Sequence, residues 1–147
     1  MADEITFRTG LPVFDGFFGP FVTGRIHLIV GGGDLSSDII NRIIIKAVLS
    51  GETPHYLDGG DRADPFAMAS LLRMRRIDPG MVLSRVMIAR AFTAYQMDAL
   101  IHQIFQGAEG NPSLMVVSSM DSLFSDPDVD EAAARGMLAN CMGSLFE

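Results

Sequence analysis

The sequence predicts a three-layer α/β fold, in which helices cover both faces of a mostly parallel sheet. Three observations predict it: short apolar runs alternate with amphipathic stretches, glycines and prolines separate these segments, and the 147 residues contain no visible linker. Strands that alternate with helices of this length are typical of βαβ units, whose strands run parallel. We therefore expect a single domain over residues 1–147.

The first predicted unit is a buried strand followed by a helix. Residues 25–30 (RIHLIV) form an apolar run rich in β-branched residues, which is typical of a buried strand, and three glycines follow it. Ser36 or Ser37 is predicted to cap a helix that ends before Gly51. Its apolar stripe consists of Ile40, Ile43, Ile44, Ala47 and Val48.

The middle of the chain repeats this alternation. Residues 55–58 are predicted to form a brief strand, and Asp64 is predicted to cap a helix that has Pro65 at its first position and runs to about Arg76. The sequence Asp-Pro-Gly at 78–80 predicts a turn, after which residues 82–89 are a strand candidate.

The last third of the chain adds two helices and one strand. A helix is expected from about Thr93, with Gly107 as its C-terminal signal, and residues 114–117 are the fourth predicted strand. Asp128 or Asp130 is expected to start a final helix that reaches the end of the chain.

Ligands of open α/β sheets bind at the carboxyl ends of the strands. Four segments are predicted to lie there: residues 31–38, 59–64, 90–93 and 118–121. Any chemistry of this protein is therefore expected in these four segments.

Composition limits the classes of function. The net charge is −7, there is one cysteine, and no apolar run approaches the length of a membrane span. The first ten residues do not resemble a signal peptide. We expect a cytoplasmic globular protein without a membrane contact.

Five arginines gather between residues 73 and 90, in a chain that is otherwise acidic: Arg73, Arg75, Arg76, Arg85 and Arg90. The first three suit the C-terminal end of a helix, where cations offset the helix dipole. Contact with an anion or a nucleic acid is the alternative, but no aromatic residues interleave these arginines. We therefore favour the first interpretation and expect no nucleic-acid partner.

The loop at residues 31–38 occupies the place of a phosphate-binding loop, between a predicted strand and a predicted helix. A working loop also needs a lysine and a hydroxyl that binds Mg²⁺. This one carries two carboxylates, of Asp34 and Asp38, and like charges at about 4 Å repel by about 4 kcal/mol at an effective dielectric constant of 20. Tight ATP binding is not expected, whereas weak binding of ATP or ADP stays open. The residues of this vestigial loop are Gly31, Gly32, Gly33, Asp34, Leu35, Ser36, Ser37 and Asp38.

Several stretches resemble the core of the RecA/RadA-type recombinases, the family that includes the KaiC-like proteins. They are TGLPVFD at residues 9–15, TGRI at 23–26, YLD at 56–58, ARAF at 89–92 and LMVV at 114–117. The order and spacing agree with the family over about residues 6–147. The resemblance implies a RecA-like P-loop fold.

The resemblance also implies that the catalytic positions have changed. The Gly-Lys-Thr of the family's Walker A motif corresponds to Ser36-Ser37-Asp38, so the lysine and the metal ligand are replaced. The Walker B carboxylate corresponds to Ser118, and the glutamate that activates water corresponds to Gly60. Phosphoryl transfer depends on these parts, so we expect no ATPase activity and no catalytic residue.

Compared with the family, the chain stops after the Walker B-like strand and its helix. The family strand that lies between the P-loop strand and the Walker B strand has no counterpart, so either these two strands pair directly or a second chain covers an open sheet edge, and we favour the second chain. We thus expect a catalytically inactive module that acts through protein contacts, as a homo-oligomer or with a recombinase-like ATPase in recombination or DNA repair. The alternatives are a weak nucleotide or anion sensor that uses residues 31–38, and nucleic-acid binding through residues 73–90.

Other candidate sites have simpler interpretations. Asp58, Asp61 and Asp64 could hold a divalent cation, but a solvated loop with Asp64 as a helix cap is preferred, and no metal is expected. Arg90 is expected to pair with Asp58 or Asp121. Cys141, on an apolar helix face without an adjacent base, is expected to be a buried structural thiol.

Overall fold

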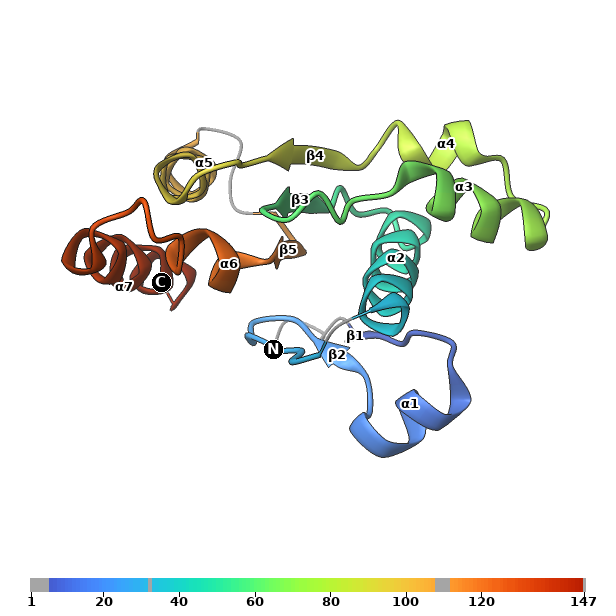
Figure 1. Ribbon diagram of the computed structural model, residues 1–147. Coiled ribbons are helices and arrows are strands. Elements are labelled where there is room, and N and C mark those ends of the chain that lie inside the picture. Colours follow the sequence, from blue (N-terminus) through green and yellow to red (C-terminus); the bar gives the residue numbers. More distant parts are fainter. Residues whose placement is uncertain (1–5, 32, 108–111, 147) are drawn as a thin grey trace. The chain divides into compact units, whose positions relative to one another are not determined.

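Helices and strands alternate along much of the chain, in a mixed α/β arrangement that includes a three-stranded parallel sheet flanked by helices (Figure 1). The computed structural model describes residues 6–31, 33–107 and 112–146. The chain divides into two compact units. The first comprises Met1–Pro54 and Asp64–Val86, and the second comprises His55–Ala63 and Met87–Glu147. The expectation of one domain over residues 1–147 stays a prediction.

The sheet belongs to the second unit. It contains β3 (His55–Asp58), β4 (Met87–Arg90) and β5 (Met115–Ser118) in the order β4-β3-β5, and both pairings are parallel. The register sets the last residue of β3, Asp58, beside Arg90 of β4 and Ser118 of β5. The prediction of β3 is confirmed at its bounds, and that of β5 to within one residue.

Among the residues of the second unit that the structure describes, three helices accompany the sheet: α5 (Ala94–Gln106), α6 (Met120–Phe124) and α7 (Glu131–Phe146). The helix α5 begins next to Thr93, as predicted, and Thr93 caps it by accepting a hydrogen bond from the Gln96 N–H. Asp130 accepts one from the Ala133 N–H before α7. Burial of their apolar faces against β3 holds the unit together. The core residues are Leu57, Ala91, Ala94, Met97, Ile101, Leu123, Phe124 and Cys141.

In its described residues, the first unit contains a short hairpin and four helices. The strands β1 (Thr6–Phe7) and β2 (Phe21–Val22) pair antiparallel, and α1 (Pro12–Phe18) lies between them in the sequence. The other helices are α2 (Asp34–Leu49), α3 (Pro65–Met74) and α4 (Pro79–Leu83), which pack on one another. Asp64 caps α3 by accepting from the N–H groups of Phe66 and Ala67, with Pro65 at the first position, as predicted.

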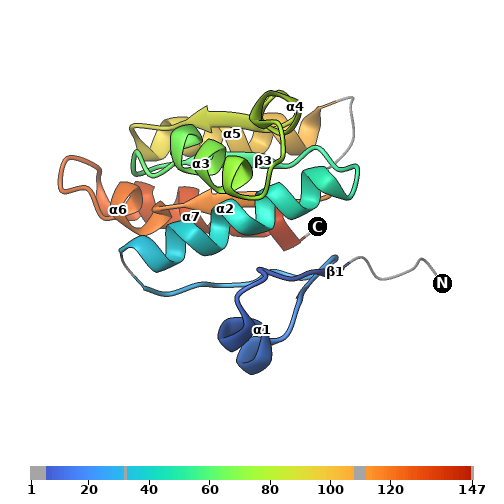
Figure 2. The same ribbon diagram turned by 90° about the vertical axis from the view of Figure 1, so that its right-hand side faces the viewer.

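The prediction of a buried strand at residues 25–30 is wrong. This stretch has no strand partner within the described ranges, and its residues are exposed, with Leu28 at 85% and Val30 at 87%. An apolar run becomes a strand only where a neighbour pairs its backbone, and apolar composition does not supply that neighbour. Figure 2 shows the extended stretch that joins the hairpin to α2, with α1 set apart from α2.

The prediction of a strand over residues 82–89 is wrong in its first half. Asp78 accepts a hydrogen bond from the Met81 N–H, and Pro79 occupies the first helical position, so Pro79–Leu83 form the short helix α4. The strand β4 begins only at Met87. None of the helices in the described ranges is long and apolar enough to cross a membrane.

Candidate functional site at the carboxyl end of the sheet

Three of the four segments predicted to form the ligand edge follow neighbouring strands of the second unit. Residues 59–63 follow β3, and Asp64, the last residue of that predicted segment, belongs to the first unit. Residues 90–93 begin at the last residue of β4, and residues 118–121 begin at the last residue of β5. Because the three strands are parallel and paired, these segments meet at one edge. The fourth segment, residues 31–38, belongs to the first unit.

The side chain of Asp58 is the centre of this edge. It is buried, and the loop that follows β3 turns back so that its backbone surrounds the carboxylate. Oδ1 accepts hydrogen bonds from the N–H groups of Gly60 (3.2 Å) and Arg62 (3.0 Å), and Oδ2 accepts one from Ala63 N–H (2.9 Å). The Ser118 hydroxyl donates to Oδ1 across the sheet at 3.0 Å. One carboxylate therefore organises the loop and ties β3 to β5.

These hydrogen bonds keep Asp58 ionised. Burial by itself raises the pKa of this carboxyl, because a charged group loses its hydration. The N–H groups of Ala63, Arg62 and Gly60, together with the Ser118 hydroxyl, outweigh burial and hold the pKa of Asp58 below its ordinary value. At neutral pH the carboxylate is therefore ionised, and its hydrogen-bond donors are backbone and side-chain groups of the protein itself.

Arg90 brings the third strand into the network. Its Nε lies 3.4 Å from Asp58 Oδ2, one terminal nitrogen lies 2.7 Å from Asp61 Oδ1, and the other donates to the Ala63 carbonyl oxygen at 2.9 Å. The predicted pairing of Arg90 is thus confirmed with Asp58, and the additional acid is Asp61 rather than Asp121. Because each nitrogen of the guanidinium has a partner, Arg90 is largely committed to this loop.

Gly59 and Gly60 are required by close approach. A Cβ atom at Gly59 would lie 2.7 Å from Leu123 Cδ1 and 2.9 Å from the Ser118 carbonyl oxygen. At Gly60 it would collide with the Ser119 hydroxyl oxygen, and Ser119 itself has a left-handed backbone with φ of 57°. Sequence reasoning treated Gly60 only as a replaced catalytic position and missed this packing. The dipeptide Gly-Gly directly after a strand was the signal for it.

The remaining acids of the loop have structural partners. Asp64 caps α3, and Asp61 is exposed and paired with Arg90. Among the described residues, no group of three His, Cys, Asp or Glu side chains is arranged to hold a metal ion. Near the last helix, Asp126 accepts from Asp128 N–H and Asp130 from Ala133 N–H, as expected of turn and cap residues.

The glycine loop of the first unit differs from the prediction. The helix α2 begins at Asp34, with Gly33 at a φ of 84° as its N-cap, so Ser36 and Ser37 do not cap it. The Ser36 hydroxyl instead donates to the Gly33 carbonyl oxygen at 3.0 Å, and Asp38 pairs with Arg42 at 2.8 Å. Gly31 is exposed, as are Asp34 and Leu35, and Gly32 lies outside the described residues. No strand directly precedes this loop within the described part of the chain, since the nearest upstream strand, β2, ends at Val22.

The arginine cluster is divided. Arg73 lies in the last turn of α3 and Arg75 is its C-cap, a position that suits cations because of the helix dipole. Arg76 follows with a left-handed backbone (φ 58°), and Arg85 donates to the Gly51 carbonyl oxygen in the same unit. Arg90 belongs to the other unit and is paired with two acids.

A second polar cluster joins α5 to α7 and was not predicted. The buried Cys141 thiol donates to Asp98 Oδ1 at 3.3 Å, and His102 Nδ1 lies 3.4 Å from the same oxygen and 2.8 Å from the Asp98 carbonyl oxygen. Burial, with the nearby Asp98, raises the pKa of Cys141 to about 12. The thiol therefore stays protonated, which agrees with the predicted structural role. The i, i+4 spacing of Asp98 and His102 could have indicated part of the cluster.

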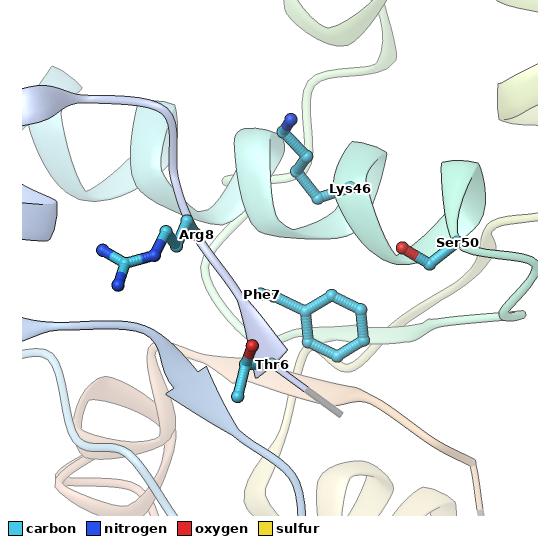
Figure 3. A pocket seen from close by; sticks show the side chains of 5 residues that line it. All are labelled: Thr6, Phe7, Arg8, Lys46 and Ser50. Atoms are coloured by element: carbon cyan, nitrogen blue, oxygen red, sulfur yellow. The ribbon is translucent and has the colours of Figure 1, made fainter. Parts of the chain in front are cut away.

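A shallow pocket of about 260 Å³ lies in the first unit, between β1 and the end of α2 (Figure 3). Its lining is Thr6, Phe7, Arg8, Lys46 and Ser50. Figure 3 shows the charged ends of Arg8 and Lys46 pointing away from each other. Lys46 lies in the last turn of α2, where its charge offsets the negative end of the helix. The two cations thus do not converge on a common ligand.

No protein-family model matches this chain, and none of the curated proteins matches it either. The structure alone defines the class of protein: a mixed α/β chain with a three-stranded parallel sheet whose carboxyl edge is closed by its own side chains. The resemblance to the RecA/RadA-type recombinases stays a prediction from sequence.

Proposed function

We propose that this protein is a non-enzymatic, RecA-like cytoplasmic module that acts through protein contacts, as a regulator or accessory of a recombinase-type ATPase in recombination or DNA repair. The observation that carries the proposal is the internal pairing of Asp58 and Arg90 at the carboxyl edge of the sheet. The carboxylate of Asp58 and the guanidinium of Arg90 bind each other and the loop backbone. In the resemblance, the position of the family's water-activating glutamate is Gly60, which lies against Ser119.

A second observation favours a role in protein contacts. Large apolar side chains are exposed along residues 13–30, among them Phe17, Phe18, Leu28 and Val30. Monomeric proteins rarely expose contiguous apolar patches of more than a few hundred Å², and larger patches mark interaction sites.

The two alternatives have less support. A nucleotide sensor at residues 31–38 would place phosphates beside the first-turn acid Asp34, at a loop that no described strand positions. Nucleic-acid binding through residues 73–90 would require Arg90, which already forms ion pairs with Asp58 and Asp61.

The proposal is tested by phosphate release from ATP, measured for this protein alone and for a recombinase-type ATPase from the same organism with and without it. We expect no turnover by the protein alone and a saturable change in the rate of the ATPase. Hydrolysis by the protein alone that Asp58→Asn abolishes would contradict the proposal, as would an ATPase rate that does not change at any ratio of the two proteins.

A further inference from the structure

We propose that the partner of the apolar surface at residues 13–30 is a second copy of this chain, and that the stretches 26–30 of the two copies pair as antiparallel strands. This inference rests on the proposed role in protein contacts and adds the identity of the partner. We call this surface the N-terminal apolar surface. Its exposed residues are Val13, Phe17, Phe18, Ile26, Leu28, Ile29 and Val30.

The two parts of the surface are joined by aromatic contacts. The ring of Phe14 lies 4.8 Å from that of Phe18 and 6.2 Å from that of Phe21, and the Phe21 ring lies 5.0 Å from His27. His27 Nε2 also accepts a hydrogen bond from the Val22 N–H at 3.0 Å. These contacts connect α1, β2 and the stretch 26–30. Figure 2 shows the helix α1 and the extended stretch that leads into α2.

The exposed apolar area matches what a stable dimer needs. The helix α1 buries none of its residues, and Phe17 is 83% exposed. The seven large apolar residues, exposed by between 37% (Ile29) and 87% (Val30), together offer on the order of 800 Å². A standard protein interface buries about 800 Å² on each partner, so this surface alone supplies one side of it.

Charge favours a second copy at this surface. The chain carries a net charge of −7, so two copies repel each other across most surfaces. Between residues 12 and 31 the only ionisable acid is Asp15, and the only arginine is Arg25. Asp15 accepts hydrogen bonds from Thr9 N–H (2.9 Å), the Thr9 hydroxyl (2.8 Å) and Gly10 N–H (2.8 Å). The N-terminal apolar surface is thus where two acidic copies can approach with little repulsion.

The backbone of residues 26–30 is suited to pairing with itself. The stretch follows the hairpin, and its backbone groups have no ladder partner among the described residues. Two identical segments that pair antiparallel are complementary by symmetry, because a two-fold axis at Leu28 sets Ile26 of each copy opposite Val30 of the other. Ile26, Leu28 and Val30 then share one face of the new ribbon.

The experiment is sedimentation velocity over a range from low to high micromolar protein, with the wild type and two variants. The wild type is expected to form a dimer. Leu28→Lys sets two ammonium groups opposite each other at the axis and is expected to raise the dimer dissociation constant by at least about tenfold. Phe66→Lys is the matched control, because Phe66 is 84% exposed, similar to Leu28 at 85%, but lies outside this surface. It is expected to leave the dimer unchanged.

Amide hydrogen exchange gives a second measurement on the same samples. Protection of residues 26–30 should rise with protein concentration in the wild type and not in Leu28→Lys. A monomer at all concentrations, a dimer that Leu28→Lys does not weaken, or protection of 26–30 in a monomer would overturn the inference, the last by showing that the chain covers this stretch itself. A monomer that still alters the rate of a recombinase-type ATPase would leave the proposed function intact, whereas a dimer that hydrolyses ATP would contradict the function alone.

Discussion

At the scale of single residues, Asp58 is the group on which the carboxyl edge of the sheet depends. Its carboxylate is buried and bonds to three backbone N–H groups, the Ser118 hydroxyl and Arg90. The Asp58 side chain is fully buried whereas that of Arg90 is 41% exposed, so it is the carboxylate that depends on these partners to compensate its lost hydration. Asp58 therefore has a structural role that the exposed acids of the same loop do not share.

We expect Asp58→Asn to lower the free energy of unfolding by about 3 kcal/mol, because it removes a buried charge that several donors surround. Urea denaturation measures this. Asp61→Asn is the control: Asp61 is exposed, so the loss should stay below about 1 kcal/mol. If the two variants lose the same free energy of unfolding, burial of Asp58 does not determine its contribution to stability.

The pH dependence follows from the lowered pKa of Asp58. Because the folded carboxyl has a pKa below its ordinary value of about 3.9, it stabilises the fold above that pH. This contribution is lost as the pH falls from about 4 through the lower pKa of the folded state. We expect the stability of Asp58→Asn to fall less steeply below pH 4 than that of the wild type.

Gly60 gives a test of close packing. Gly60→Ala introduces a Cβ that meets the Ser119 side chain, and we expect a loss of about 1–3 kcal/mol in the free energy of unfolding. Gly143→Ala is the matched control, since a Cβ there has open space on the helix α7. It should stabilise the protein by about 0.5–1 kcal/mol, because alanine favours a helix. A neutral Gly60→Ala would contradict the close approach.

At the scale of elements, the cap of α3 is the feature that sequence and structure define most alike. Asp64 accepts from two N–H groups at the start of the helix, at 2.9 and 3.0 Å. We expect Asp64→Ala to cost about 1 kcal/mol in urea denaturation, and Asp64→Asn only a few tenths, because asparagine caps nearly as well. If the two substitutions cost the same, the capping hydrogen bonds contribute nothing measurable.

The sequence predicted best those elements that have local signals at their ends. The helices α3 and α5 have a capping residue and a clear apolar face. The strand β3 is a short, mostly buried run that two glycines and a polar loop follow. Residues 25–30 have strand composition but no described strand beside them, and pairing is a property of the whole chain. The helices α1 and α6 were missed because they span seven and five residues, too few for a periodic pattern.

The candidate site was predictable in outline but not in detail. Parallel strands require that the ends of β3, β4 and β5 meet, and the pairing of Arg90 with Asp58 follows from their register. The return of the loop to Asp58 and the fit of Gly60 against Ser119 depend on backbone geometry that residue types alone do not specify. The Cys141–Asp98 bond joins residues 43 positions apart, so it required the packing of α5 on α7.

At the scale of the whole molecule, an acidic chain carries a sheet edge closed by its own side chains and an exposed apolar surface. A net charge of −7 disfavours polyphosphates unless cations converge on them, and two of the cations near the glycine loop and the carboxyl edge, Arg42 and Arg90, are each paired with an acid. We therefore expect this protein to bind a partner through apolar contacts and not to bind a nucleotide tightly.

The most direct test of this account is a calorimetric titration of the purified protein with ATP and Mg²⁺, with Asp34→Asn measured in parallel. The account predicts no saturable heat for the wild type at millimolar nucleotide, and at most weak binding for Asp34→Asn, which removes one repelling charge. Saturable binding of ATP by the wild type with a dissociation constant in the micromolar range would contradict it.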